Sequence, residues 1–184
     1  MRLADRLLAI HQALSAADLP HAFGGAIALA YWTEDPRGTS DIDVNIFIPA
    51  EDCERALEAL PEGVAVPEGV AAQVVEQGQA RLWWDRTPID LFFNTVPIHE
   101  DAARHRRTVP FEGTEIQILG PVELAVFKAM FDRTKDWADI EAMIAANTLD
   151  LNALRVALLE LLGPDDCRFA RIDEAVRQVE AESA

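Results

Sequence analysis

The segment from residue 41 to residue 48 constrains the fold most, because polar and aliphatic residues alternate along it. In a β-strand, successive side chains point to opposite faces of the sheet. One face would carry the aliphatic residues Ile42, Val44, Ile46 and Ile48. The other would carry Asp41, Asp43 and Asn45. The first set predicts a core face, and the second predicts either a solvated face or a site.

Two carboxylates on one strand face repel each other, and a divalent cation would offset that repulsion. A site built from oxygen ligands suits Mg²⁺, which takes one or two protein carboxylates and completes its coordination with water and substrate phosphate. Asp41 and Asp43 are therefore candidate metal ligands. The alternative is an acidic strand surface in contact with solvent.

A glycine pair, Gly24-Gly25, separates a short extended segment at 21–23 from a helix that we predict over 26–32. Glycines between a strand and a helix allow unusual backbone dihedrals and a close approach of a ligand. The first N–H groups of the helix are then available to an anion. The alternative is a plain turn.

A hairpin is predicted from strands at 80–84 and 89–94, joined by a turn at 85–88. Asp90 is an isolated acid in the apolar and aromatic second strand, where burial is costly unless a cation pairs with it. If this strand lies beside the one that carries Asp43, three carboxylates meet around one cavity. The alternative is an ion pair of Asp90 with Arg81 or Arg86.

The rest of the chain predicts a mixed α/β fold with a core over residues 1–120 and a helical C-terminal part over 121–184. Further helices are expected over 3–16, 51–60 and 98–107, and in the last third over 121–130, 135–146, 150–162 and 165–181. Further strands are expected at 64–66, 109–111 and 115–119, while 70–76 fits a strand or a helix.

Two basic features leave alternatives open. Lys128 lies in an otherwise apolar helical segment and either reaches outward to solvent or contacts a phosphate. The cluster over 104–107 either offsets the dipole at a helix C-terminus or contacts an anion.

Composition excludes several classes of protein. A formal charge of −16 disfavours nonspecific binding to DNA or to an anionic membrane. Cys53 and Cys167 show no metal-ligand spacing, so we expect free thiols in a reducing compartment. The N-terminal segment is amphipathic, which is unlike a signal peptide. No apolar segment is as long as a membrane-spanning helix, which needs about 18 consecutive apolar residues. A soluble, cytoplasmic protein is expected.

Taken in order, three motifs resemble those of the polymerase-beta type nucleotidyltransferase superfamily: the glycine pair, Ser40-Asp41-Ile42-Asp43-Val44, and Pro88-Ile89-Asp90-Leu91. The later segments 122–128 and 134–140 are similar to those of small bacterial members, such as AbiEii-type toxins and antibiotic nucleotidyltransferases. The resemblance covers roughly residues 20–145.

The resemblance implies a mixed sheet flanked by helices, and transfer of a nucleoside monophosphate from a nucleoside triphosphate (NTP) such as ATP to a hydroxyl group with the help of Mg²⁺. The catalytic and metal-binding residues implied are Asp41, Asp43 and Asp90. Asp90 would also accept the proton of the attacking hydroxyl. The nucleotide-binding residues expected are Gly24, Gly25, Ser40 and Lys128.

The acceptor is open: an aminoglycoside-like small molecule, a protein side chain or a tRNA end would each supply a hydroxyl. The acidic charge favours a cationic small molecule. One departure from the resemblance is Ala26, where many members have a serine that assists phosphate binding. It keeps a second hypothesis open, a noncatalytic binding or regulatory module such as one partner of a toxin-antitoxin pair.

Overall fold

The computed structural model describes residues 1–36 and 38–182. Arg37, which precedes the motif at 40–44, lies outside the described residues, as do residues 183–184 at the end of the helical C-terminal part. The chain forms two compact units. The first holds residues up to Ile27 and from Gly38 to Leu119, and the second holds a short segment from Ala28 and the helices from Gly120 onward.

A mixed sheet forms the centre of the first unit, and its described strands follow the order β3-β4-β5-β2-β1-β7-β6. The strands are β1 (His21–Phe23), β2 (Ile42–Pro49), β3 (Val64–Ala65), β4 (Gln79–Trp84), β5 (Thr87–Asn94), β6 (Arg107–Phe111) and β7 (Thr114–Ile118). β2 runs parallel to β5 and antiparallel to β1, and β1 runs parallel to β7. The outer pairs β3–β4, β4–β5 and β6–β7 are antiparallel.

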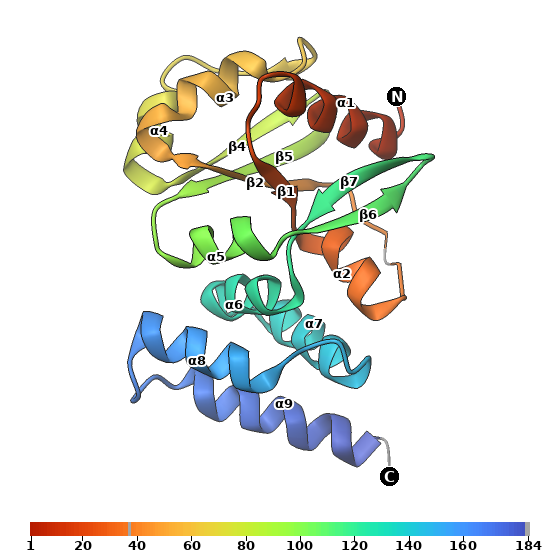
Figure 1. Ribbon diagram of the computed structural model, residues 1–184, viewed down its shortest axis with the longest axis vertical. Coiled ribbons are helices and arrows are strands. Elements are labelled where there is room, and N and C mark those ends of the chain that lie inside the picture. Colours follow the sequence, from red (N-terminus) through yellow and green to blue (C-terminus); the bar gives the residue numbers. More distant parts are fainter. Residues whose placement is uncertain (37, 183–184) are drawn as a thin grey trace. The chain divides into compact units, whose positions relative to one another are not determined.

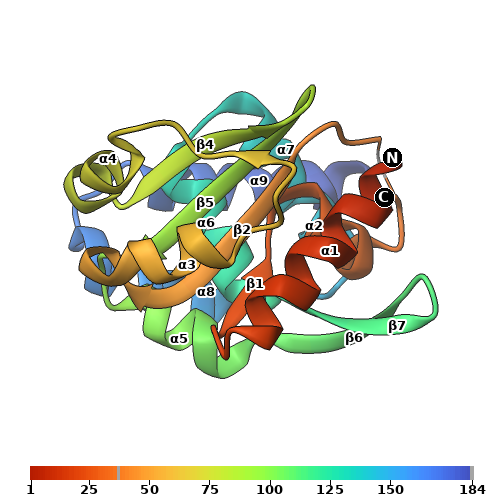
Figure 2. The ribbon, with the colours of Figure 1, turned by 90° about the horizontal axis from the view of Figure 1, so that it is seen from above.

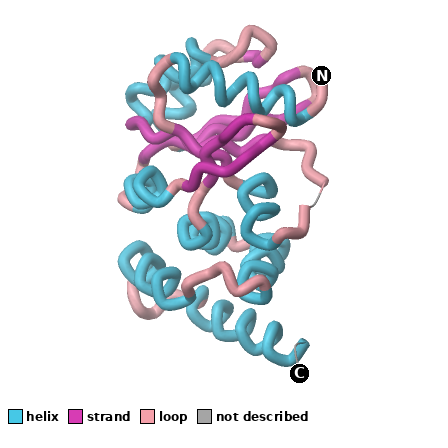
Figure 3. Tube along the Cα trace, turned by 45° about the vertical axis from the view of Figure 1, so that its right-hand side comes forward, coloured by secondary structure: helices cyan, strands magenta, loops and turns pink. Residues whose placement is uncertain are grey.

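Helices cover both faces of this sheet (Figures 1 and 3). α1 (Leu3–Ala16), α3 (Cys53–Ala59) and α4 (Val70–Gln77) lie on one face, and the view from above shows them across the strands (Figure 2). α5 (Ile98–His105) lies on the other face, below the sheet in Figure 1. α2 (Gly25–Thr33) begins in the first unit directly after β1.

The core of the first unit lies between the sheet and α1, α3 and α4. Alternate residues of β5 are fully buried, Ile89, Leu91 and Phe93 among them. Burial of such a side chain contributes about 1.5–3 kcal/mol. Arg6 of α1 donates from Nη1 to Thr87 Oγ1 at 2.5 Å, and Thr87 shares the face of Ile89. Arg6 of α1 therefore lies on the aliphatic face of β5, at the start of the strand, and Asp90 lies on the opposite face.

The second unit contains α6 (Pro121–Phe131), α7 (Thr134–Ala145), α8 (Leu151–Leu162) and α9 (Arg168–Glu182). Each helix buries part of one apolar side, for example Leu124, Ile140, Leu158 and Ile172. Local chemistry fixes two helix starts. Pro121 occupies the first turn of α6, and the Asp150 side chain accepts hydrogen bonds from the N–H groups of residues 152 and 153 at the start of α8.

The structure confirms the predicted mixed sheet, the flanking helices and the helical C-terminal part. The segment at 70–76, which also fitted a strand, is a helix, because Gly69 and Gly78 take left-handed conformations that end it on both sides. The helix expected over 98–107 ends at His105, and Arg107 begins β6. Within the described residues, no helix is both long and apolar enough to cross a membrane.

Candidate functional site

The acidic face of the sheet forms a row across three neighbouring strands. Asp43 of β2 and Asp90 of β5 are Cα partners in a parallel pair, and Arg81 of β4 is the partner of Asp90 on its other side. Neighbouring strands lie about 4.8 Å apart, and residues in register point to the same face. The fold therefore places the carboxylates of Asp43 and Asp90 side by side, although 47 positions of sequence separate them (90 − 43).

Both residues of the glycine pair lie in direct contact with Asp43. The Gly24 N–H donates to the Asp43 carbonyl at 2.9 Å, which continues the row beyond the end of β1. Gly25 has a φ of +50°, and an ideal Cβ at this position would lie 1.9 Å from Asp43 Oδ2. A side chain at residue 25 and the observed Asp43 carboxylate thus exclude each other. Because α2 begins at Gly25, the free N–H groups of its first turn lie beside this carboxylate.

Asp41 lies one residue before β2 rather than within it, and it is half-buried. Thr39 Oγ1 donates to Asp41 Oδ1 at 2.5 Å, which fixes the carboxylate against the loop. Thr39 was missed by the sequence reasoning, although a hydroxyl residue two positions before an acid is a known pattern of local hydrogen bonding. Ser40 lies between them in the bend and is exposed.

Asp90 makes a bidentate ion pair with Arg81. Arg81 Nε donates to Oδ1 at 2.7 Å, and Nη2 donates to Oδ2 at 2.6 Å. The alternative of an ion pair with Arg81 is thus what the structure contains. These hydrogen bonds raise the pKa of the Arg81 guanidinium, and the charges of Asp41 and Asp43 raise it further. Three carboxylates therefore act on one guanidinium.

Magnesium suits this donor set by its chemistry. Asp43 and Asp90 offer carboxylate oxygens from adjacent positions, and Mg²⁺ needs only one or two protein carboxylates when phosphate and water complete its shell. Among the described residues, no three or more His, Cys, Asp or Glu side chains are grouped as metal ligands. Two of the three carboxylates have other partners, since Arg81 engages both oxygens of Asp90 and Thr39 engages Asp41.

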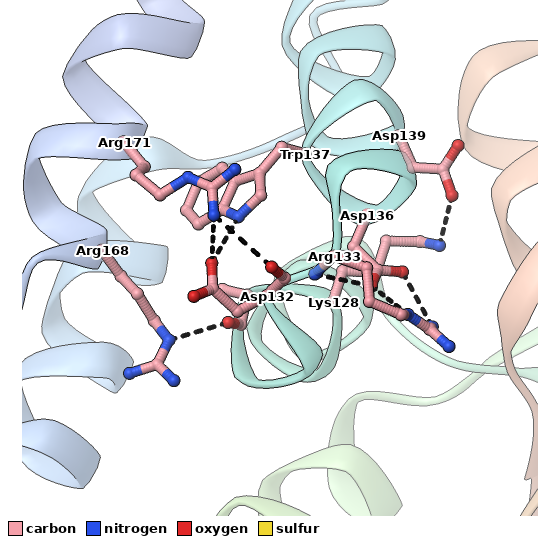
Figure 4. Close-up of polar contacts among 9 residues, drawn as sticks. Lys128, Asp132, Arg133, Asp136, Trp137, Asp139, Arg168 and Arg171 are labelled. Atoms are coloured by element: carbon pink, nitrogen blue, oxygen red, sulfur yellow. Dashed lines mark hydrogen bonds and ion pairs between the residues drawn. The ribbon is translucent and has the colours of Figure 1, made fainter.

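Lys128 belongs to the second unit. It is buried in α6, and its Nζ lies 2.6 Å from Asp139 Oδ2 of α7 (Figure 4). The alternative in which Lys128 reaches outward to solvent is wrong, because the side chain is buried and its ammonium pairs with a carboxylate, whereas the contact with a phosphate stays a prediction.

The charged segment that follows α6, residues 132–139, makes hydrogen bonds that link three helices (Figure 4). Asp132 ends α6 in a left-handed conformation and accepts hydrogen bonds from Trp137 Nε1 of α7 and Arg171 Nη1 of α9. Asp136 and Arg133 pair at the start of α7 as a capping box. This segment therefore supplies the C-cap of α6 and the N-terminal capping box of α7.

Comparisons with known proteins agree with this architecture. Residues 6–183 match the profile of a family described as "Nucleotidyl transferase AbiEii toxin, Type IV TA system". A comparison with curated protein sequences found no match.

Two solved structures of the antibiotic-resistance factor ANT(2'')-Ia are similar in fold. The crystal structure in complex with adenylyl-2''-tobramycin has a TM-score of 0.61 at 14% identity, with 93% of this chain and 97% of that chain covered. The solution structure has a TM-score of 0.56 at 12% identity, with 95% and 97% covered. At such identity the likeness concerns the fold. Since the family profile spans nearly the whole sequence, the chain belongs to the AbiEii family of nucleotidyltransferase toxins.

Proposed function

We propose that the protein transfers a nucleoside monophosphate from an NTP to a hydroxyl group of an acceptor, in a reaction that depends on Mg²⁺. The observation that carries the proposal is the row in which the Gly24-Gly25 turn, Asp43 and Asp90 occupy adjacent positions across the sheet. Carboxylates next to a glycine turn and a helix N-terminus provide both metal ligands and a phosphate site. Membership in a nucleotidyltransferase family supports this reading.

In the proposed reaction the acceptor oxygen attacks the α-phosphorus, the bond from that phosphorus to the bridging oxygen breaks, and pyrophosphate leaves. Mg²⁺, when bound, supplies charge neutralisation on the phosphates and on the attacking oxygen. Asp41 and Asp43 would hold both cations, and Asp90 would complete the ligands of the cation on the acceptor side. Asp90 also takes the proton of the attacking hydroxyl. The N–H groups at Gly25 and at the first turn of α2 bind phosphate oxygens. Positioning and electrostatics then provide the rate enhancement without a covalent enzyme intermediate.

The remaining nucleotide contacts that we propose are Ser40 and Lys128. Ser40 is exposed in the loop that leads into β2, so its hydroxyl is accessible to a ligand. Lys128 binds a phosphate in this proposal only if its ammonium exchanges Asp139 for the ligand. A Lys128→Met variant with an unchanged KM for the NTP would assign this lysine to the helix packing alone.

For the acceptor we propose a cationic small molecule with free hydroxyl groups. The formal charge of −16 favours a cationic ligand over a polyanion such as tRNA. The fold neighbour ANT(2'')-Ia was solved in complex with adenylyl-2''-tobramycin.

For the location of the protein we propose a reducing compartment such as the cytoplasm, because both cysteines are free thiols.

A noncatalytic role is the second candidate. The ion pair of Arg81 with both oxygens of Asp90 favours it, because a metal-binding carboxylate needs free lone pairs. In that case the chain binds a protein partner, as the toxin-antitoxin description of the family suggests.

The test is incorporation of label from α-³²P-NTPs, each with MgCl₂, into the small molecules, proteins and RNA of a cell extract. We expect the wild-type protein to label one acceptor class and the Asp43→Asn variant to react about 10²–10³-fold more slowly, as expected when a transition-state charge partner is removed. Asp52→Asn, an equal change at an exposed residue of the same unit, serves as the control. Equal labelling by wild type and Asp43→Asn would refute the catalytic assignment.

A further inference from the structure

Arg81 is a cation of the candidate site, and the reaction proposed above gives it no role. It lies on β4, and its guanidinium meets Asp90 through two hydrogen bonds of 2.7 and 2.6 Å. This fork geometry matches the two oxygens of a carboxylate and is among the stronger ion-pair arrangements. Both oxygens of Asp90 are therefore engaged by one side chain.

The guanidinium also offsets the repulsion within the acidic row. Asp43 is the in-register partner of Asp90, and like charges on adjacent strands destabilise a sheet. Asp41 and Asp43 both contribute to the electrostatic stabilisation of the charged Arg81. Arg81 thus performs, within the protein, the charge compensation that a divalent cation would also perform.

The two members of the ion pair differ in their freedom to move. The Asp90 side chain is 15% exposed and is held by a strand with neighbours on both sides, whereas the Arg81 side chain is 55% exposed. The pair can open when Arg81 turns into solvent, without any change in the backbone of the sheet.

We propose that Arg81 competes with the divalent cation for the Asp90 carboxylate, so that it holds the acidic row together in the absence of the ion and lowers the affinity of the site for it. The inference rests on the proposed metal-dependent transfer. Arg81 is in this sense a regulatory residue of the site, and loading of the ion requires that its side chain leaves Asp90.

The experiment measures binding of Mn²⁺, a spectroscopic substitute for Mg²⁺, to protein treated with EDTA and then dialysed. Electron paramagnetic resonance of free Mn²⁺ gives the dissociation constant. We expect Arg81→Gln to bind Mn²⁺ about tenfold more tightly than wild type, the lower end of the effect of a hydrogen bond to a charged group. Arg81→Lys keeps the charge but cannot span both oxygens, so its affinity is expected to lie between the two. Arg86→Gln, with the same change in net charge at the exposed turn of the hairpin, is expected to bind like wild type.

Thermal unfolding gives a second readout, in which the dependence on the ion distinguishes the competition from a merely structural role. In EDTA the unfolding temperature of Arg81→Gln is expected to fall below that of wild type, because the Asp90 carboxylate loses its ion-pair partner. Addition of Mn²⁺ is then expected to raise it by more than it raises that of wild type.

Two different results separate failure of this inference from failure of the proposed function. If Asp43→Asn weakens Mn²⁺ binding while Arg81→Gln and Arg81→Lys bind no more tightly than wild type, the metal site stands and the competition is refuted. If no variant binds Mn²⁺, or if Asp43→Asn binds like wild type, the metal-dependent function fails and the competition fails with it.

Discussion

Replacement of Gly25 by alanine tests the closest contact in the candidate site. The residue has a φ of +50°, which costs an L-residue about 1–2 kcal/mol. The new Cβ would lie 1.9 Å from Asp43 Oδ2, so the carboxylate or the turn must shift. Forced shifts of this kind cost about 1–3 kcal/mol. We therefore expect Gly25→Ala to lower the free energy of unfolding by about 2–5 kcal/mol, the sum of these two costs.

A matched control separates the two contributions. Gly113 also has a positive φ, +82°, but an added Cβ there meets nothing within 4 Å. Gly113→Ala is therefore expected to show the backbone cost alone, about 1–2 kcal/mol. In an Asp43→Ala background, where the clashing oxygen is absent and only the Cβ of residue 43 remains, at 3.2 Å, the cost of Gly25→Ala should fall toward the same value.

Urea unfolding followed by circular dichroism measures the double-mutant cycle of wild type, Gly25→Ala, Asp43→Ala and the double variant, with Gly113→Ala as the separate control. The reasoning is refuted if Gly25→Ala costs no more than Gly113→Ala, or if its cost is the same with and without the Asp43 carboxylate. Either result would mean that the contact with Asp43 adds no measurable cost.

Two other predictions concern the second unit and the pH dependence. Lys128→Met leaves Asp139 without the cation of its buried ion pair, so the free energy of unfolding should fall by about 3–5 kcal/mol. The double variant Lys128→Met with Asp139→Leu should recover much of this loss. An unchanged urea midpoint for Lys128→Met would contradict the burial of the pair. Burial lowers the pKa of His21 and of His11 below the ordinary 6.5. A hydrogen bond links the two rings, with His11 Nδ1 2.8 Å from His21 Nε2. The unfolded chain then binds more protons than the fold, so the stability contributed by the neutral pair is present above pH 6.5 and is lost as the pH falls below it. His21→Asn should flatten this dependence, and a variant that keeps the wild-type slope would assign it to other groups.

Most of the secondary structure could be predicted from the sequence. The alternation over 41–48 indicates a strand with one aliphatic face, and β2 has buried aliphatic residues at 42, 44 and 46. The helical period over 3–16 matches the bounds of α1. The segment 70–76 has no clear period, so the sequence left open whether it is a strand or a helix. In the structure it is a helix between two glycines in left-handed conformations.

The sequence named the residues of the candidate site as hypotheses and left their contacts open. It did not decide whether the strands of Asp43 and Asp90 are neighbours, and it offered both Arg81 and Arg86 as ion-pair partners of Asp90. Only the antiparallel register of β4 and β5, which makes Arg81 the direct neighbour of Asp90, decides between them.

The sequence by itself determined which faces of the strands are apolar and where the chain turns, because periodicity and glycine or proline placement act over a few neighbouring residues. The tertiary structure decided which strands are neighbours. It also brought the turn at Gly25 against the Asp43 carboxylate and paired the Lys128 ammonium with Asp139. These contacts join positions far apart along the chain. They form because burial of whole sheet and helix faces selects one arrangement, and a local pattern carries no information about that selection.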